Sequence, residues 1–316
     1  MNREKFTEVS QWLNSQIVGQ SKLIDRLLTT LICGGHLLVE GAPGLAKTRA
    51  IKELANVVSG EFHRIQFTPD LLPSDVTGTE IYRPETGAFE FQQGPIFNNL
   101  VLADEVNRAP AKVQSALLEA MGEQQVSIGR ETYSLPKLFM VMATQNPIEQ
   151  EGTYPLPEAQ LDRFLMHIEV LYPDAEAEAR ILHLVRSENA NQPKQPPMRP
   201  LTEEEIFSAR KETLELHMAP SVEEYIIALV MATRNPPEKL KPWLSYGASP
   251  RATIALDQCA RTVAWLAGKD FVSPDDVQEV AHDVLRHRLI VSFEALAEDV
   301  SANTIVSDLL DWVPVP

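Results

Sequence analysis

The stretch Gly41-Ala42-Pro43-Gly44-Leu45-Ala46-Lys47-Thr48 decides the fold, because it joins an apolar run at 37–39 to a helix that begins near Lys47. A short apolar strand followed by a Gly/Pro-rich turn and a helix directs several backbone N–H groups and the positive helix end at one spot. We therefore predict a phosphate-binding loop, in which Lys47 reaches the β- and γ-phosphates of a triphosphate and the Thr48 hydroxyl holds Mg²⁺. The alternative is a plain strand-to-helix turn that contains a lysine by chance.

The loop departs from the usual pattern at Ala46, which stands where a glycine normally precedes the lysine. Alanine takes ordinary helical backbone angles but not the freer ones open to glycine, so we expect a slightly stiffer loop with an intact phosphate cradle. Beyond the loop, apolar residues recur at helical spacing, which predicts an amphipathic helix that packs on a sheet. These residues are Ile51, Leu54, Ala55 and Val58.

The composition is that of an ordinary soluble globular protein, with 44% hydrophobic and 23% charged residues in a chain of 316. That length predicts about two domains. Neither a secretory signal nor an apolar span of bilayer length is apparent, and Cys33 and Cys259 fit neither a disulfide framework nor a metal knuckle. We therefore expect a cytoplasmic protein without membrane insertion. The net charge of −16 argues against general binding of duplex nucleic acid, although an assembly can still build a local basic pore.

The predicted fold class is α/β. Five apolar, strand-like runs alternate with helical or loop segments, which predicts a mainly parallel sheet covered on both faces. The runs are 37–39, 63–67, 100–103, 138–143 and 164–170. Two further segments, 81–91 and 126–133, carry a Gly-containing turn between alternating arms and predict inserted β-hairpins.

The flanking segments are predicted to be helical. Residues 7–32 form a helical pattern interrupted at Val18-Gly19-Gln20. Four prolines between 191 and 200 exclude a helix or a central strand, which places a domain boundary there. The chain after this boundary is expected to be helical throughout, with helices at 203–216, 222–234, 250–267 and 274–289.

A second polar cluster follows the apolar run at 100–103, where the carboxylates Asp104 and Glu105 come in succession. One carboxylate at a strand end can bind Mg²⁺ through its water shell while its neighbour polarises an attacking water, and we assign the first role to Asp104 and the second to Glu105. An ordinary acidic strand end is the alternative. In an alternating fold, however, this strand and the strand before the loop would end at the same edge of the sheet.

Each of three further polar residues has two possible roles, and the sequence does not decide between them. Asn146 follows an apolar strand and is expected to orient the lytic water or to touch the γ-phosphate, but Asn-Pro is also a common turn starter. Arg163 precedes the last strand and is either a surface residue or a cation lent to a neighbouring active site. Arg108 either contacts a neighbouring subunit or forms a local salt bridge, and the sequence favours neither role.

In this order the motifs resemble those of the AAA+ ATPases. Residues 41–48 match Walker A, 100–105 match Walker B, Asn146 matches sensor 1, Arg163 the arginine finger, and Ser249-Pro250-Arg251 sensor 2. The resemblance narrows to the MoxR family, in which alanine precedes the loop lysine. Its other marks stand at 104–109, 114–121, 143–147 and 157–164. The match is dense up to residue 170 and thinner beyond it, where Arg251 is the only functional residue carried over.

The resemblance implies a ring-forming, usually hexameric ATPase that binds ATP and Mg²⁺ and has a chaperone-like role. Such proteins often work with a von Willebrand A domain protein and sometimes in metal insertion. The resemblance places Val18, Gly19 and Gln20 against the adenine, and it places the two hairpins at the central pore as the helix-2 and pre-sensor-1 inserts. In this branch the lid is displaced, so the resemblance implies that Arg251 can act on a neighbour's nucleotide instead of its own.

The sequence therefore predicts an AAA+ αβα nucleotide-binding domain at 1–190, a Pro-rich linker at 191–200 and an all-α lid domain at 201–316. The predicted function is ATP hydrolysis in a ring, coupled to remodelling or maturation of a partner protein. Two alternatives stay open, namely the motor subunit of a metal (Mg/Co) chelatase-like complex and a nucleotide-gated scaffold with incidental turnover. A helicase is disfavoured by the net charge of −16, and no direct nucleic acid contact is expected.

Overall fold

The computed structural model describes residues 2–85, 87–129, 131–148, 152–190 and 195–316. The chain forms two compact units, each built from separate stretches. The sheet unit comprises Glu8–Leu156 and Ile168–Glu205, and the helical unit comprises the N-terminal segment through Thr7, Pro157–His167 and Ile206–Pro316. Residues 191–194 of the predicted linker lie outside the described residues, and the predicted domain bounds stay a prediction.

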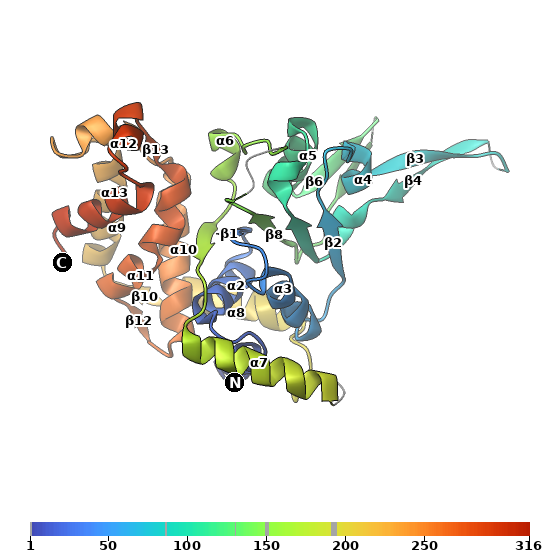
Figure 1. Cartoon of the computed structure of the whole chain (residues 1–316), viewed down its shortest axis with the longest axis horizontal. Coiled ribbons are helices and arrows are strands. Elements are labelled where there is room, and N and C mark those ends of the chain that lie inside the picture. Colours follow the sequence, from blue (N-terminus) through green and yellow to red (C-terminus); the bar gives the residue numbers. More distant parts are fainter. Residues whose placement is uncertain (1, 86, 130, 149–151, 191–194) are drawn as a thin grey trace. The chain divides into compact units, whose positions relative to one another are not determined.

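A five-stranded parallel sheet forms the centre of the fold, with strand order β2-β5-β8-β1-β9 (Figure 1). The strands are β1 Leu37–Gly41, β2 Phe62–Gln66, β5 Leu100–Asp104, β8 Met140–Gln145 and β9 Met166–Val170. All five predicted strands are confirmed. The three central strands are buried on both faces, as continuous apolar runs require, apart from polar residues at their carboxyl ends.

Helices alternate with these strands along the chain. The helices within Asn2–Ala190 are α1 Asn2–Gln16, α2 Ser21–Cys33, α3 Lys47–Asn56, α4 Pro73–Thr77, α5 Ala111–Glu123, α6 Glu158–Leu161 and α7 Ala175–Ala190. The predicted break at 18–20 separates α1 from α2. Phe6 of α1 packs edge-on against Trp265 with ring centroids 5.5 Å apart, and this contact ties the N-terminal segment into the helical unit.

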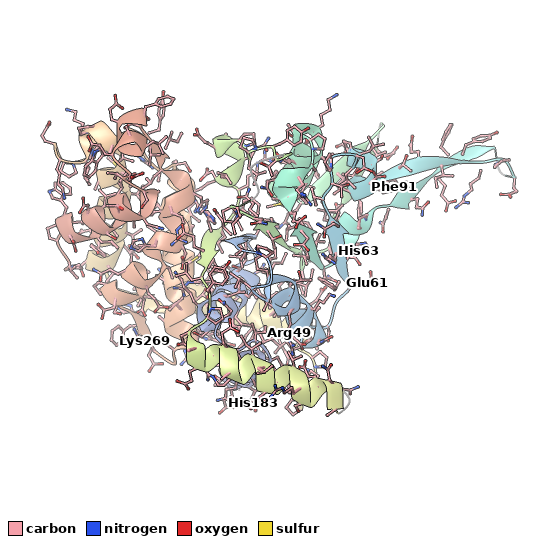
Figure 2. The ribbon with its side chains drawn as sticks, in the orientation of Figure 1. Arg49, Glu61, His63, Phe91, His183 and Lys269 are labelled. Atoms are coloured by element: carbon pink, nitrogen blue, oxygen red, sulfur yellow. The ribbon has the colours of Figure 1, made fainter. Side chains whose placement is uncertain are left out.

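Both predicted hairpins are present in the sheet unit. β3 Gly78–Arg83 pairs with β4 Ala88–Gln93, and β6 Gln125–Ile128 pairs with β7 Glu131–Ser134; residues 86 and 130 at their tips lie outside the described residues. The β3–β4 hairpin extends away from the sheet (Figure 1). Phe91 (labelled in Figure 2) stacks on Tyr133 of the second hairpin with ring centroids 4.1 Å apart, so the two inserts share an aromatic contact.

The helical unit departs from the prediction in two respects. Its helices, with the first turn of α8 in the sheet unit, are α8 Glu203–Glu215, α9 Pro220–Arg234, α10 Pro250–Leu266, α11 Pro274–Leu285, α12 Phe293–Ala297 and α13 Ala302–Trp312. The expectation of an entirely helical segment is wrong, because β10 His217–Met218 pairs with β12 Phe271–Val272 and β11 Leu244–Tyr246 pairs with β13 Ile290–Val291. The helix predicted to reach 289 ends at Leu285, since the chain tightens into the 3₁₀ turn Arg286–Arg288 before the extended backbone of β13.

Among the described residues, none of the helices combines the length and the apolar character needed to cross a bilayer.

His36 is a buried titratable residue that directly precedes β1. Its Nδ1 accepts a hydrogen bond from Val141 N at 3.0 Å, and its Nε2 lies 3.2 Å from Met121 O. A ring nitrogen that accepts carries no proton, so the ring is the neutral tautomer with hydrogen on Nε2. Burial lowers the pKa of His36 from 6.5 to about 4, although the bond to Met121 opposes this shift.

Acid should therefore weaken the sheet unit through His36. Because its folded pKa lies below its unfolded value, its contribution is complete above pH 6.5 and is lost as the pH falls toward about 4. The free energy of unfolding should fall by up to about 1.4 kcal/mol per pH unit in this window. Urea unfolding across this range should show a smaller pH slope for His36→Gln, whose amide donates and accepts without titrating. Exposed His183→Gln on α7 (Figure 2) is the control, and an unchanged slope in His36→Gln contradicts the assignment.

Candidate active site

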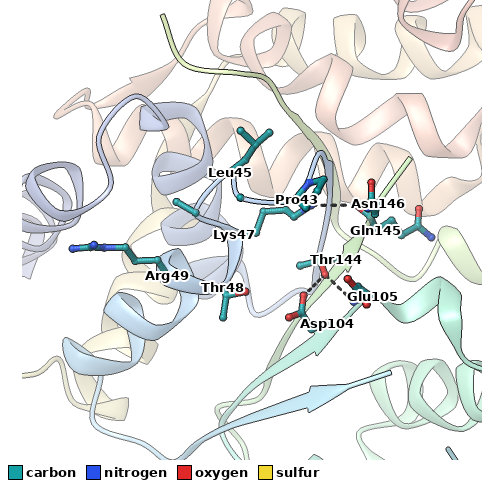
Figure 3. Close-up of a pocket in the computed structure, with 12 residues that line it drawn as sticks. Pro43, Leu45, Lys47, Thr48, Arg49, Asp104, Glu105, Thr144, Gln145 and Asn146 are labelled. Carbon is teal, nitrogen blue, oxygen red and sulfur yellow. Dashed lines mark hydrogen bonds between the residues drawn. The ribbon is translucent and has the colours of Figure 1, made fainter. Parts of the chain in front are cut away.

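Polar residues from three neighbouring strand ends meet in one cavity of about 350 Å³ (Figure 3). The loop between β1 and α3 forms one wall, and residues at the ends of β5 and β8 form the other. The prediction that the loop and the carboxylates share one edge of the sheet is confirmed. The lining residues are Pro43, Gly44, Leu45, Ala46, Lys47, Thr48, Arg49, Asp104, Glu105, Thr144, Gln145 and Asn146.

Ala46 adopts left-handed backbone angles, with φ 57° and ψ 15°. The expectation that alanine would keep ordinary angles is therefore wrong. The physical reason is the entry into α3, since Ala46 is its N-cap and the Ala46 carbonyl accepts the first helical hydrogen bond, from Ala50 N at 2.9 Å. An L-residue in this region costs roughly 1–2 kcal/mol relative to right-handed angles. The loop thus holds backbone strain next to Lys47.

The Lys47 ammonium lies within the loop, where it donates to the carbonyl oxygens of Gly41, Ala42 and Gln145. The contacts to Ala42 and Gln145 measure 3.3 and 3.4 Å. Burial lowers the pKa of Lys47, and the nearby carboxylates of Asp104, Glu105 and Glu40 offset part of this effect. A cation held by backbone oxygens at the start of a helix can exchange these partners for anionic oxygens.

Thr144 holds the Asp104 carboxylate and the Glu105 backbone in place, and no role was predicted for it from the sequence. Its hydroxyl donates to Asp104 Oδ1 at 2.6 Å and accepts from Glu105 N at 2.9 Å. The second oxygen of Asp104, Oδ2, accepts from Arg64 Nε at 3.0 Å and from Arg64 Nη2 at 2.6 Å. Asp104 is therefore oriented by two strands, β8 and β2.

Glu105 also takes left-handed angles, with φ 57° and ψ 50°. Its Oε2 accepts from Gln66 Nε2 at 2.8 Å and from Arg108 Nη1 at 3.2 Å. Arg108 thus forms a local salt bridge, one of the two alternatives left by the sequence. Strained angles in a non-glycine residue persist only where the surroundings fix them, and here the bond from its amide to Thr144 supplies part of that support.

Asn146 lines the same cavity and is only 6% exposed. Its Oδ1 accepts from Ile148 N at 3.1 Å, so the side chain also closes the turn that the Asn-Pro pair predicts. Asn146 therefore lines the cavity and also forms a turn, while its expected contact with the lytic water or the γ-phosphate stays a prediction.

A second pocket of about 150 Å³ adjoins the first and shares the loop residues Gly44, Leu45 and Ala46 with it. Gly19 lets the α1–α2 turn approach α7, because its φ is 78° and an added Cβ would lie 2.9 Å from Ala177 Cβ. Gln20 Nε2 fixes the turn by donating to Leu171 O at 3.0 Å. The other lining residues are Gln16, Ile17, Val18, Gln20, Arg49, Pro173, Glu178, Ile181, Leu184 and Val185.

Arg49 joins α3 to α7 at the border of the two pockets. Its guanidinium forms two hydrogen bonds with Glu188, of which the Nη1–Oε2 bond measures 3.1 Å. The bond to Glu188 raises the pKa of Arg49, and the same bond lowers the pKa of Glu188. No local sequence pattern indicates this pair, because 139 positions separate its members.

Arg163 and Arg251 both belong to the helical unit. Ser249 caps α10 by accepting from Arg251 N at 3.2 Å, and its hydroxyl donates to Asp162 Oδ2 at 2.9 Å. Arg251 Nη1 lies 3.5 Å from the same carboxylate oxygen. The structure thus connects the predicted sensor 2 arginine to the residue that precedes Arg163.

The strain at Ala46 can be measured through stability. Ala46→Gly removes the cost of left-handed angles, roughly 1–2 kcal/mol, but glycine also stabilises the unfolded chain by about 0.4–1 kcal/mol through its higher entropy. The free energy of unfolding should therefore rise by about 0.5–1 kcal/mol. Ala55→Gly, in the last turn of the same helix, should lower it, by at most about 0.5–1 kcal/mol. Chemical denaturation of both variants measures these changes, and destabilisation by Ala46→Gly would contradict the left-handed assignment.

Comparison with known proteins agrees with this geometry. A family model described as "ATPase family associated with various cellular activities (AAA)" matches residues 36–166, and an AAA lid domain model matches residues 240–309. Chaperone MoxR1 of Mycobacterium tuberculosis is 46% identical over 304 residues, which cover 95% of this chain and 79% of the relative. Protein MoxR of Paracoccus denitrificans is 30% identical, with coverage of 99% and 96%. A crystal structure from Cytophaga hutchinsonii matches with a TM-score of 0.91 at 47% identity, covering 100% of this chain and 96% of its own. This chain therefore belongs to the MoxR family of AAA ATPases.

Proposed function

We propose that this chain binds ATP with Mg²⁺ and hydrolyses the nucleotide in a ring of like subunits, and that turnover drives remodelling or maturation of a partner protein. One observation carries the proposal. A single cavity contains the loop lysine, a hydroxyl, two carboxylates and an amide, from Lys47, Thr48, Asp104, Glu105 and Asn146. This set supplies the charge, the hard oxygen ligands and the base that phosphoryl transfer to water requires.

The loop binds the triphosphate. Backbone N–H groups at the start of α3 and the Lys47 ammonium give the phosphates a positive environment. The adjoining pocket is lined largely by aliphatic side chains, among them Ile17, Ile181 and Val185, and takes the adenine. Because the two pockets share Gly44, Leu45 and Ala46, one ligand can extend through both.

The residues present fit Mg²⁺, because the Thr48 hydroxyl and the Asp104 carboxylate are hard oxygen donors that line one cavity. When bound, Mg²⁺ would neutralise negative charge on the transferring phosphoryl group. Thr144 and Arg64 orient the Asp104 carboxylate toward this role through the hydrogen bonds described above. Both hydrogen bonds from Arg64 go to one carboxylate oxygen of Asp104, Oδ2.

Glu105 acts as the general base. It takes the proton of the attacking water, while Asn146 orients that water beside the γ-phosphate. Gln66 and Arg108 hold Glu105 Oε2, so they set the position from which the carboxylate reaches the water.

The first test separates binding from chemistry. Glu105→Gln should keep ATP affinity near that of the unmodified chain and lower turnover by about 10²–10⁴-fold, because the amide cannot accept the proton. Lys47→Ala should lose ATP binding itself. Equilibrium binding of ATP and steady-state turnover measure the two effects. A scaffold with incidental turnover predicts that Glu105→Gln keeps full partner activity, and equal loss of binding in both variants would show that these roles are assigned wrongly.

Arg163 completes a neighbouring subunit's site in this proposal. A cation that neutralises charge built up only in the transition state is worth roughly 10³–10⁵ in rate. Arg163→Ala should therefore bind ATP almost normally and scarcely hydrolyse it.

Mixing distinguishes a residue supplied to a neighbour from one used within its own chain. Arg163→Ala chains mixed with Lys47→Ala chains should regain part of the activity, because some boundaries then join an intact pocket to an intact arginine. An Arg163→Ala chain with full activity, or a mixture without recovery, would overturn the ring mechanism.

The hairpins are the proposed contacts to the partner, for which a von Willebrand A domain protein remains our expectation. Phe89 and Tyr82 lie near the end of the first hairpin with 68% and 51% of their surfaces exposed and with ring centroids 5.4 Å apart. Phe91, two positions along the same strand, instead packs against Phe97 and Tyr133. An exposed aromatic pair on an extended insert suits contact with another protein, whereas Phe91 supports the base of the insert.

A further inference from the structure

Three consecutive basic residues are buried at the end of α11. Arg286, His287 and Arg288 form a 3₁₀ turn, and each is at most 8% exposed. Removing an arginine from water costs several kcal/mol unless its donors are satisfied, and arginine is rarely buried without partners. The hydrogen-bond partners of these three side chains therefore indicate which segment the turn holds in place.

All three side chains bind the segment that carries Arg163. Arg288 donates from Nη2 to Phe164 O at 2.7 Å and from Nη1 to Leu165 O at 3.1 Å. His287 Nε2 lies 3.1 Å from Phe164 O, and Arg286 Nη1 donates to His167 O at 2.9 Å. Arg288 Nη2 also lies 3.4 Å from Asp162 O. Carbonyl groups on both sides of Arg163 are thus fixed by one turn.

The Asp162 side chain extends this network to Arg251. Its Oδ1 accepts from Arg288 Nε at 2.9 Å, while its Oδ2 receives the contacts from Ser249 and Arg251. One carboxylate next to Arg163 therefore joins the turn that ends α11 to the first turn of α10. All of these residues belong to the helical unit, which includes Pro157–His167 although the sheet unit surrounds that stretch in sequence.

We propose that Arg288 is a positioning residue for Arg163, and that the network around Asp162 makes Arg163 and Arg251 move as one body with the helical unit. The inference rests on the proposed function, in which Arg163 reaches a neighbouring nucleotide. Its consequence is that a displacement of the helical unit carries both cations together. Arg288 is buried and is not among the residues that line the cavity, so it acts through the backbone on either side of Arg163.

Arg288→Lys tests the proposal. Lysine keeps the positive charge and can reach one acceptor, but it cannot bind Asp162 and two carbonyl groups at once. We expect kcat to fall by about 10²-fold with little change in the KM for ATP, because misplacement of a group by about 1 Å costs that much. Arg261→Lys is the matched control. Arg261 also binds a carboxylate and a carbonyl oxygen in the helical unit, those of Asp257 and Leu216, and kcat should be retained in this variant.

Mixed assemblies provide a readout that general damage to the fold would not give. Arg288→Lys chains should regain activity when mixed with Lys47→Ala chains, which still supply a well-placed Arg163. They should stay inactive when mixed with Arg163→Ala chains. Recovery in neither mixture would mean that Arg288→Lys damages its own pocket, and full activity of Arg288→Lys alone would mean that Arg288 positions nothing; both outcomes overturn the inference.

Arg163→Ala, assayed in parallel, distinguishes a failure of the proposed function from a failure of the inference about Arg288. If Arg163→Ala keeps full activity, the proposed function fails; if it is inactive while Arg288→Lys is fully active, only the inference fails. Should Arg288→Lys not fold, as judged by thermal unfolding, Asp162→Asn replaces it in the same mixtures. This variant removes the carboxylate and leaves the carbonyl contacts of Arg288 intact, so we expect the same recovery pattern with a smaller loss of kcat. An Asp162→Asn chain with unchanged kcat would contradict the network.

Discussion

The parallel pairing of β5, β8 and β1 is the constraint on which the site depends. The register Ala103↔Ala143 brings Asp104 beside Thr144, and Leu38↔Ala143 brings the start of the phosphate loop to the same edge. A shift of one residue would move every side chain of a strand to the other face. The buried apolar residues of the three strands fix the register, because both faces of the sheet are covered. The packing of the core and the position of the polar groups in the cavity therefore depend on the same strand register.

Two strained residues lie on opposite sides of the cavity. Ala46 precedes Lys47, the proposed phosphate ligand, and Glu105 is the proposed base; both Ala46 and Glu105 have left-handed backbone angles. Each is held by an element that the fold fixes independently, Ala46 by the first turn of α3 and Glu105 by the Thr144 hydroxyl. Strain of this kind persists only where the surroundings over-determine it, and it keeps the reacting groups in place before the ligand arrives.

The sequence was sufficient for the five strands, both hairpins and the meeting of the loop with the two carboxylates in one cavity, because apolar runs and turn residues are local signals. It failed where the deciding contact crosses the sheet or joins distant segments. Arg64 orients Asp104 only through the β2–β5 pairing, and Arg288 reaches the segment of Arg163 over more than a hundred positions. Ala46 was misjudged for another reason. Its side chain disfavours left-handed angles, but the geometry of the loop and helix overrides that preference.

The proposed function depends above all on hydrolysis at the boundaries between subunits. The most direct measurement is the rate of ATP turnover per chain over a wide range of protein concentrations, with sedimentation at the same concentrations. We expect the turnover rate per chain to rise with protein concentration in parallel with the fraction of chains that sediment as assemblies, because each pocket needs the Arg163 of a neighbour. A rate per chain that stays constant down to concentrations at which only single chains sediment would contradict it.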